Sequence, residues 1–279
     1  MGTKPVVAAV DGSLESLRAV EWAALEARRH SAPLRIVSAP AVMPRVHAYH
    51  ASPAEIAVAL RGVAMRALDA AVTRSEEVAP GLSVETGLLA GSPALAVAES
   101  GTGAAMLVVG ARGAGGFAAL VLGSVSRYAA TWAPCPVVVV REESMAVHRE
   151  IAVGVRDPQE STAALAFAFE EAALRGADLV AVHTWRSLPA DQHPVAAEAA
   201  ASLAATLEAW RDKYPGVRVR HDVIHGHAAR VLASYSARAD LVVLGRHGHP
   251  AGVGPGIGSV QHAVLDHAHG PVAVVPAAP

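Results

Sequence analysis

The residues with the clearest chemical potential are glycines and serines within the stretch "VVGARGAGGFAALVLGSVSR", residues 108–127. Gly110 ends a short apolar run, Gly113 follows it closely, and Gly123 stands directly before Ser124. Glycine lets the backbone come close to a ligand, and the start of a helix offers free N–H groups with a partial positive charge. The hydroxyl of Ser124 adds a donor. The stretch therefore predicts a backbone cradle for an anion such as phosphate.

The same spacing, G-x2-G-x9-G-S, occurs a second time in the chain. The second copy consists of Gly245, Gly248, Gly258 and Ser259. The flanking segments repeat as well, and the pairs are residues 5–16 with 150–161, 90–100 with 225–235, and 133–141 with 268–276. Because whole segments recur in the same order, the chain is interpreted as a duplicated domain. We expect one domain over residues 1–141 and another over residues 150–279.

Short β-branched runs alternate with longer alanine-rich stretches in each copy. The strands expected in the first copy cover residues 5–10, 34–38, 83–88, 105–109 and 136–140. The helices expected there cover residues 14–30, 53–78, 92–100 and 124–132, with Ser13 or Ser16, Ser52 and Ser92 as N-caps. Strands that are apolar on both faces are typical of a parallel sheet covered by helices. Each copy is therefore predicted to be a doubly wound α/β domain, which binds ligands where the strand order reverses.

The composition and the missing motifs exclude several function classes. The formal net charge of −2 gives no reason to expect nucleic acid or an anionic membrane as a partner. The single cysteine, Cys135, excludes an internal disulfide and a cysteine-based zinc site. The sequence has no P-loop, no dinucleotide fingerprint after the first strand and no G-x-S-x-G hydrolase elbow. Without a signal-peptide pattern or a run of about 18 apolar residues, we expect a soluble, cytoplasmic protein.

With these motifs in place, both copies resemble universal stress protein domains, and the whole chain resembles the tandem members of that family. The hallmark of the family is G-x2-G-x9-G-[ST] after the fourth strand, which both copies carry. The resemblance implies a five-stranded parallel sheet in each domain and ATP, or a related adenine nucleotide, at the motif. It also implies that domains pair through their last strands, residues 136–140 and 271–275. Because no P-loop lysine is present, we expect Mg²⁺ to accompany the phosphates.

The resemblance also assigns binding residues in the first copy. Asp11, which follows Val10 at the end of the first strand, would lie near the adenosine, where a carboxylate suits the ribose hydroxyls or the adenine amine. Val37 and Ser38 would line the adenine slot. Arg112, inside the loop, could reach a phosphate or stay solvated. The residues that would surround the ribose and the phosphates are Val109, Gly110, Gly113, Gly123, Ser124, Val125 and Ser126.

The second copy departs from this pattern in three places. Arg156 stands where the first copy has Asp11, and Gln261 stands where it has Ser126. The loop "HPAGVGPGI", residues 249–257, contains two prolines, so its path is expected to differ. The glycine frame survives, but the ribose contact does not. The second domain is therefore predicted to carry a degenerate nucleotide site.

Three functions remain open at this point. The first is a non-catalytic nucleotide-binding protein that acts in the stress response or in signalling. The second is a slow ATPase or an adenylyl-transferring protein, which would need a base near the γ-phosphate, whereas Asp11 is the only acid obviously near the site. The third is a scaffold that associates through its strands without a ligand. The many histidines of the second copy, including His227, His267 and His269, are interpreted as polar loop residues.

Overall fold

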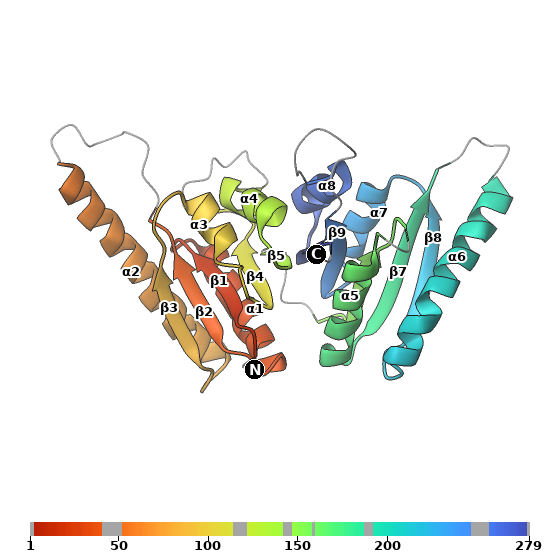
Figure 1. The fold of residues 1–279 in the computed structure, drawn as a ribbon, viewed down its shortest axis with the longest axis horizontal. Helices are drawn as coiled ribbons and strands as arrows, with labels where there is room; N and C mark the ends of the chain where they lie inside the picture. Colours follow the sequence, from red (N-terminus) through yellow and green to blue (C-terminus); the bar gives the residue numbers. More distant parts are fainter. Residues whose placement is uncertain are drawn as a thin grey trace. The chain divides into compact units, whose positions relative to one another are not determined.

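A computed structural model describes residues 3–40, 52–113, 122–141, 147–157, 160–186, 192–246 and 257–277 of the 279-residue chain. The chain divides into two compact units, Met1–Arg141 (unit 1) and Glu142–Pro279 (unit 2), and each is described by itself (Figure 1). No helix in the described part of the chain is both long enough and apolar enough to cross a membrane.

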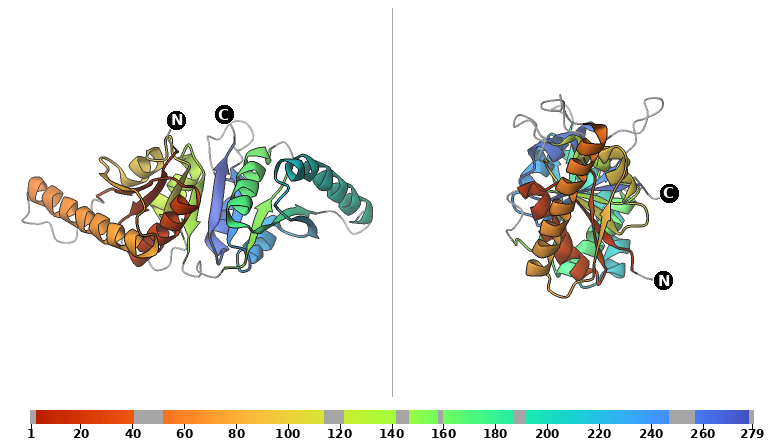
Figure 2. Two further views of the ribbon diagram at one scale, coloured as in Figure 1. Left: turned by 90° about the horizontal axis from the view of Figure 1, so that it is seen from below. Right: turned by 90° about the vertical axis from the view of Figure 1, so that its left-hand side faces the viewer.

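Unit 1 is a five-stranded parallel sheet with the order β3-β2-β1-β4-β5. Helices α1 and α2 pack together on one side of this sheet, and α3 packs with α4 on the other (Figure 2). The chain runs from β1 outward to β3 and then returns to β4, so the strand order reverses between β1 and β4. The elements are β1 (Val6–Val10), α1 (Leu14–Arg29), β2 (Leu34–Ser38), α2 (Pro53–Val78), β3 (Val84–Leu88), α3 (Pro93–Glu99), β4 (Met106–Gly110), α4 (Ser124–Trp132) and β5 (Val137–Val140).

Unit 2 repeats this arrangement, with the strand order β10-β9-β6-β7-β8. The reversal of strand order now lies between β6 and β9. The elements are β6 (Glu150–Gly154), α5 (Thr162–Arg175), β7 (Asp178–Trp185), α6 (Gln192–Lys213), β8 (Val219–His225), α7 (Ala228–Tyr235), β9 (Leu241–Arg246), α8 (Ser259–His267) and β10 (Val272–Pro276). The predicted doubly wound fold, with parallel strands and helices on both faces, is confirmed in both units.

The sheets are buried because their strands are apolar on both faces. Val6, Val7 and Ala8 of β1 have no exposed surface, and Val137 and Val138 of β5 have none either. Aromatic residues make up only 4% of the chain, so Ala, Val and Leu fill most of the core. Burial of such side chains contributes roughly 25 cal/mol for each Å² removed from water. The central strands are therefore held firmly, and their carboxyl ends have fixed positions.

Most of the predicted helix caps are present. Ser13 caps α1 by accepting from the backbone N–H of Ser16 at 3.2 Å, and Ser52 forms a capping box with Glu55 at the start of α2. Ser92 is different, because its side chain makes no capping hydrogen bond and α3 starts with Pro93 instead. Proline fixes a helical φ at the first position, so it favours the start of α3 without a side-chain cap.

Candidate functional site

The candidate site of unit 1 lies at the carboxyl ends of the adjacent strands β1 and β4. After β1 the chain continues to β2 on one side, and after β4 it continues to β5 on the other. These two strands pair in parallel, with Val6 opposite Met106 and Ala8 opposite Val108. Their carboxyl ends therefore open at the same edge of the sheet, the place where doubly wound sheets bind ligands. The backbone N–H of Gly123 donates to the carbonyl of Ala111 at 2.8 Å, which holds the start of α4 beside the end of β4.

Asp11 and Gly113 lie against each other across this reversal point. One carboxylate oxygen of Asp11, Oδ1, accepts from the backbone N–H of Ser13 at 3.0 Å and from its hydroxyl at 2.7 Å. The other oxygen faces the motif loop, since a Cβ on Gly113 would lie 2.2 Å from Oδ2. Real Cβ atoms do not come that close to an oxygen, so the carboxylate would have to move. Gly113 thus keeps the loop close to Asp11.

Gly110 is a glycine because of helix packing. A Cβ at this position would lie 2.8 Å from the backbone carbonyl carbon and oxygen of Glu15, in the first turn of α1. The backbone cannot yield as a flexible side chain would. The contact that requires this glycine is therefore with α1, and its predicted role of making room for phosphates stays a prediction.

Two serines of the predicted nucleotide site make internal hydrogen bonds, and their contacts with a nucleotide stay predictions. The hydroxyl of Ser126, which is buried, donates to the carbonyl of Gly110 at 2.6 Å. The hydroxyl of Ser38, also buried, donates to the carbonyl of Val10 at 2.8 Å. A buried carbonyl needs a partner, so these bonds hold the ends of β4 and β1 in place. Both serines thus stabilise the strand ends that form the site.

The start of α4 presents its first turn toward the site. Its N-cap, Gly123, has extended dihedrals (φ −69°, ψ 157°), no side chain caps the helix, and the first turn has no acidic residue. Ser124 is exposed and Val125 is half-buried. The first N–H groups of a helix have no partner within the helix. This end of α4 therefore offers backbone donors and a partial positive charge.

The remaining predicted residues frame the site. Nη2 of Arg112 lies 3.5 Å from Oε1 of Glu15, so the loop pairs with α1, while the side chain of Arg112 stays 41% exposed. The side chains of Val10, Val37 and Val109 are buried in the core. Only the backbone of these valines is left to face a ligand.

A hollow of about 370 Å³ opens next to this site, at the carboxyl ends of β2 and β3. The sequence pattern did not predict this hollow, although the ends of neighbouring parallel strands share one edge of a sheet. It is lined by Pro40, Ala57, Val58, Arg61, Leu88, Leu89, Ala90 and Gly91. Most of these residues are apolar, so the hollow suits a flat, weakly polar group better than a charged one.

Unit 2 keeps the same two internal hydrogen bonds with different residues. Nε2 of Gln261 donates to the carbonyl of Gly245 at 2.7 Å, as Ser126 does to Gly110. Nδ1 of His183 donates to the carbonyl of Val155 at 2.9 Å. His183 occupies the position that Ser38 has in unit 1, a correspondence visible only once the strands are aligned. The exchange of Ser126 for Gln261 therefore preserves a structural bond.

The other departure of unit 2 changes the chemistry of the site. Arg156 is 67% exposed and pairs with Glu160. Oδ1 of Asp157, one position later, accepts from the backbone N–H of Glu160 at 3.2 Å. Gly258 caps α8 without a side-chain bond, and Ser259 is exposed like Ser124. Gly248 lies outside the described residues.

The sequence matches the Universal stress protein family twice, over residues 2–141 and over residues 148–276. The chain belongs to the universal stress protein family. It is 35% identical over 282 residues to a universal stress protein of Mycobacterium tuberculosis, with 96% of each chain covered. It is 34% identical to one of Mycolicibacterium smegmatis, with 97% of this chain and 96% of the relative covered.

The fold is also that of solved members of the family. A universal stress protein of Archaeoglobus fulgidus superposes with a TM-score of 0.73, over 99% of this chain and 97% of that one. Its sequence is 18% identical. Both tandem domains therefore follow the family architecture along the whole chain.

Proposed function

We propose that unit 1 binds an adenine nucleotide, ATP with Mg²⁺ in the first place, at the reversal point between β1 and β4. The observation that carries the proposal is the start of α4, an uncapped helix end without acidic residues beside the carboxyl end of β4. Backbone N–H groups of this kind bind phosphate oxygens, and the helix dipole favours their charge. Gly123 lies against the carbonyl oxygen of Ala111, so it packs the start of this helix closely onto the end of β4.

Asp11 suits the nucleoside part of such a ligand. Its Oδ1 is engaged by Ser13, which fixes the orientation of the carboxylate, and Oδ2 faces the motif loop. A carboxylate held in this way accepts hydrogen bonds from ribose hydroxyls. Arg112 belongs to the same loop and keeps exposed surface through which it can contact a phosphate.

The hollow at the ends of β2 and β3 is the proposed place of the adenine. Neighbouring strands lie about 4.8 Å apart, so the hollow is separated from the start of α4 by roughly two to three strand spacings. An extended nucleotide can bridge such a distance, with Asp11 at the ribose between base and phosphates. Leu88, Leu89 and Pro40 provide apolar surface for the base.

Binding without turnover is the proposed mode of action, in stress response or signalling. The two acids in the described part of the site, Asp11 and Glu15, already accept bonds from Ser13 and Arg112. Bound Mg²⁺ would neutralise phosphate charge. Hydrolysis would require a base free to activate water at the γ-phosphate. The predicted association through residues 136–140 and 271–275 and the predicted cytoplasmic location stay predictions.

Unit 2 is proposed to have lost the nucleoside contact. Arg156 cannot accept a hydrogen bond from a ribose hydroxyl, because a guanidinium has donors only. It is also engaged by Glu160. The glycine frame at Gly245 and Gly258 is kept for the fold of the strand end and helix start.

A comparison of ATP with inorganic triphosphate tests these assignments. Asp11→Asn keeps an oxygen for Ser13 but removes the charge, so it should weaken Mg-ATP binding about 5- to 10-fold and leave triphosphate binding nearly unchanged. Calorimetric titration of the wild type and of Asp11→Asn, each with Mg-ATP and with triphosphate, measures these affinities. Equal affinities of wild type and Asp11→Asn for ATP would contradict the role of Asp11.

A further inference from the structure

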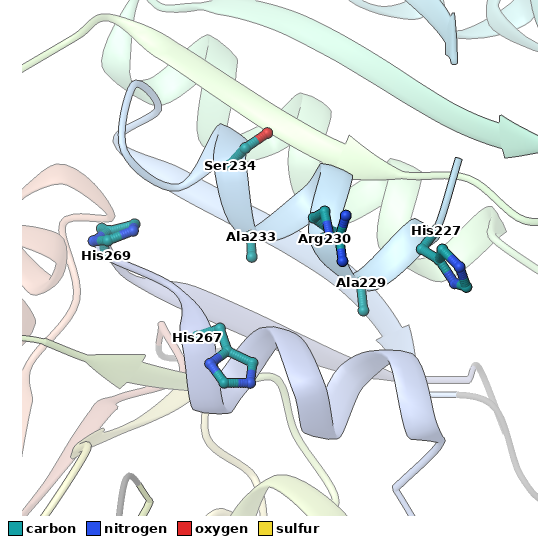
Figure 3. A pocket seen from close by; sticks show the side chains of 7 residues that line it. All are labelled: His227, Ala229, Arg230, Ala233, Ser234, His267 and His269. Carbon is teal, nitrogen blue, oxygen red and sulfur yellow. The ribbon is translucent and has the colours of Figure 1, made fainter. Parts of the chain in front are cut away.

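A second feature of unit 2 lies between two of its helices. A groove of about 530 Å³ runs between α7 and α8 (Figure 3). Ala229 and Ala233 point into it from α7, and their small side chains leave the space open. The groove is otherwise lined by His227, Arg230, Ser234, His267 and His269. Its volume is that of a small-molecule site.

Among the described residues, the polar lining of this groove consists of one guanidinium, three imidazoles and one hydroxyl, with no carboxylate. A guanidinium presents a fork of N–H donors that fits phosphate or carboxylate oxygens, and each imidazole adds a donor. The hydroxyl of Ser234 instead donates to the carbonyl of Val231 at 2.7 Å. All five polar side chains are exposed to the groove or to solvent. Such a lining favours an anion.

The start of α7 adds to this preference. His227 is its N-cap, with extended dihedrals (φ −81°, ψ 118°), and its side chain makes no capping hydrogen bond. Arg230 stands one turn further along, and Figure 3 shows His227 at one end of the groove and His269 at the other. The anionic group therefore belongs near His227 and Arg230, where the helix dipole is positive.

Unit 1 provides an internal comparison, because α3 and α4 pack together as α7 and α8 do. Arg230 corresponds to Leu95, and His267 to Trp132; these two residues of unit 1 are 44% and 45% exposed. The other groove residues His227, Ser234 and His269 correspond to Ser92, Glu99 and Pro134. The fold therefore does not require arginine or histidine side chains at this face. They are specific to unit 2.

The histidines alone would also suggest a metal ion. A shared ion needs ring nitrogens that converge, but among the described residues these three imidazoles are not gathered within 4.8 Å of one another. Arg230 in the same lining would repel a cation. His267 ends α8, about 12 Å along the helix from Ser259, so the His267 end of the groove is remote from the motif.

We propose that the α7–α8 groove of unit 2 binds a small molecule with a phosphate group, held by Arg230 and His227 at the start of α7. His267 and His269 contact the rest of the ligand at the far end. The site is independent of the nucleotide site proposed for unit 1.

Pyrophosphate is the probe that tests this site. Its titration into the full chain, followed by the imidazole proton resonances in NMR spectra, should shift the signals of His227, His267 and His269 saturably, and His→Gln variants assign these signals. Arg230→Gln should weaken the binding that these signals report about 10- to 100-fold. Arg218→Gln is the matched control, because it removes the same charge from an exposed position of unit 2 where Arg218 only pairs with Asp178.

Each outcome of this titration either supports or overturns the proposed phosphate site. Saturable shifts that Arg230→Gln weakens and Arg218→Gln leaves intact support the site. Absent or non-saturable shifts overturn it, as does equal weakening by both variants, which would indicate a general charge effect. Shifts caused by Zn²⁺ but not by pyrophosphate would make the groove a metal site and overturn the anionic assignment.

Discussion

Gly110 and Gly123 belong to the same motif, but they are glycines for different physical reasons. At Gly110 a side chain would meet the backbone of α1, whereas at Gly123 the nearest atom to an added Cβ is the carbonyl oxygen of Ala111, at 3.4 Å. The sequence spacing predicts the motif but not this distinction, because the contact with Glu15 joins residues far apart in the chain. The same holds for Ser126, whose hydroxyl turned out to be used by Gly110.

Gly110→Ala is therefore expected to lower the free energy of unfolding by about 1–3 kcal/mol, as overpacking against a rigid backbone does. Gly123→Ala fits without such a clash and should cost about 1 kcal/mol or less, the loss of a better N-cap residue. Urea unfolding of both variants measures the difference. Equal losses would contradict the packing role of Gly110.

Ser126→Ala should also destabilise the protein, because it leaves the carbonyl of Gly110 buried without its partner. The expected loss is about 1–3 kcal/mol in the free energy of unfolding. Ser124→Ala, two residues earlier and exposed, is the matched control and should change it little. If the two changes cost the same, the buried hydrogen bond does not hold the end of β4.

At the scale of elements, the sequence predicts the strands and helices of unit 1 to within one residue at each end. The reason is local, since apolar β-branched runs and serine or proline caps specify where strands and helices begin. Ser92 marks the limit of this reasoning, because a serine before a proline does not have to cap with its side chain. The hollow beside β2 and β3 escaped prediction because residues from three separate elements form it.

The capping box of α2 predicts a pH dependence of stability. The backbone N–H and the hydroxyl of Ser52 donate to the carboxylate of Glu55, and these bonds, the backbone one first, lower the pKa of Glu55 below its usual 4.5. The folded state thus favours the ionised form. The resulting stabilisation is present above pH 4.5 and is lost as the pH falls through the lowered pKa.

Glu55→Gln should therefore remove part of the loss of stability between pH 6 and pH 3. Chemical unfolding of wild type and Glu55→Gln at pH 6 and at pH 3 measures this loss of unfolding free energy. The contribution of Glu55 is the loss in the wild type minus the loss in the variant. An identical loss in both proteins would mean that the capping box does not persist in solution.

On the scale of the whole molecule, two copies of one scaffold carry different surfaces. The internal bonds at the strand ends are preserved, by Ser126 and Ser38 in unit 1 and by Gln261 and His183 in unit 2. The exposed positions have diverged, with Arg156 in place of Asp11 and Arg230 in place of Leu95. Duplication thus kept the fold while the exposed residues of the two units diverged.

The number of Mg-ATP molecules bound per chain tests the central claim most directly. Calorimetric titration of the nucleotide-free chain should give one site per chain. Gly123→Val should abolish this site, because its branched side chain crowds the carbonyl of Ala111 and the Cα of Arg112 and displaces the start of α4. Circular dichroism should show that the variant still folds. Two sites per chain, no binding by the folded wild type, or one site that survives Gly123→Val would contradict the assignment of the nucleotide to unit 1.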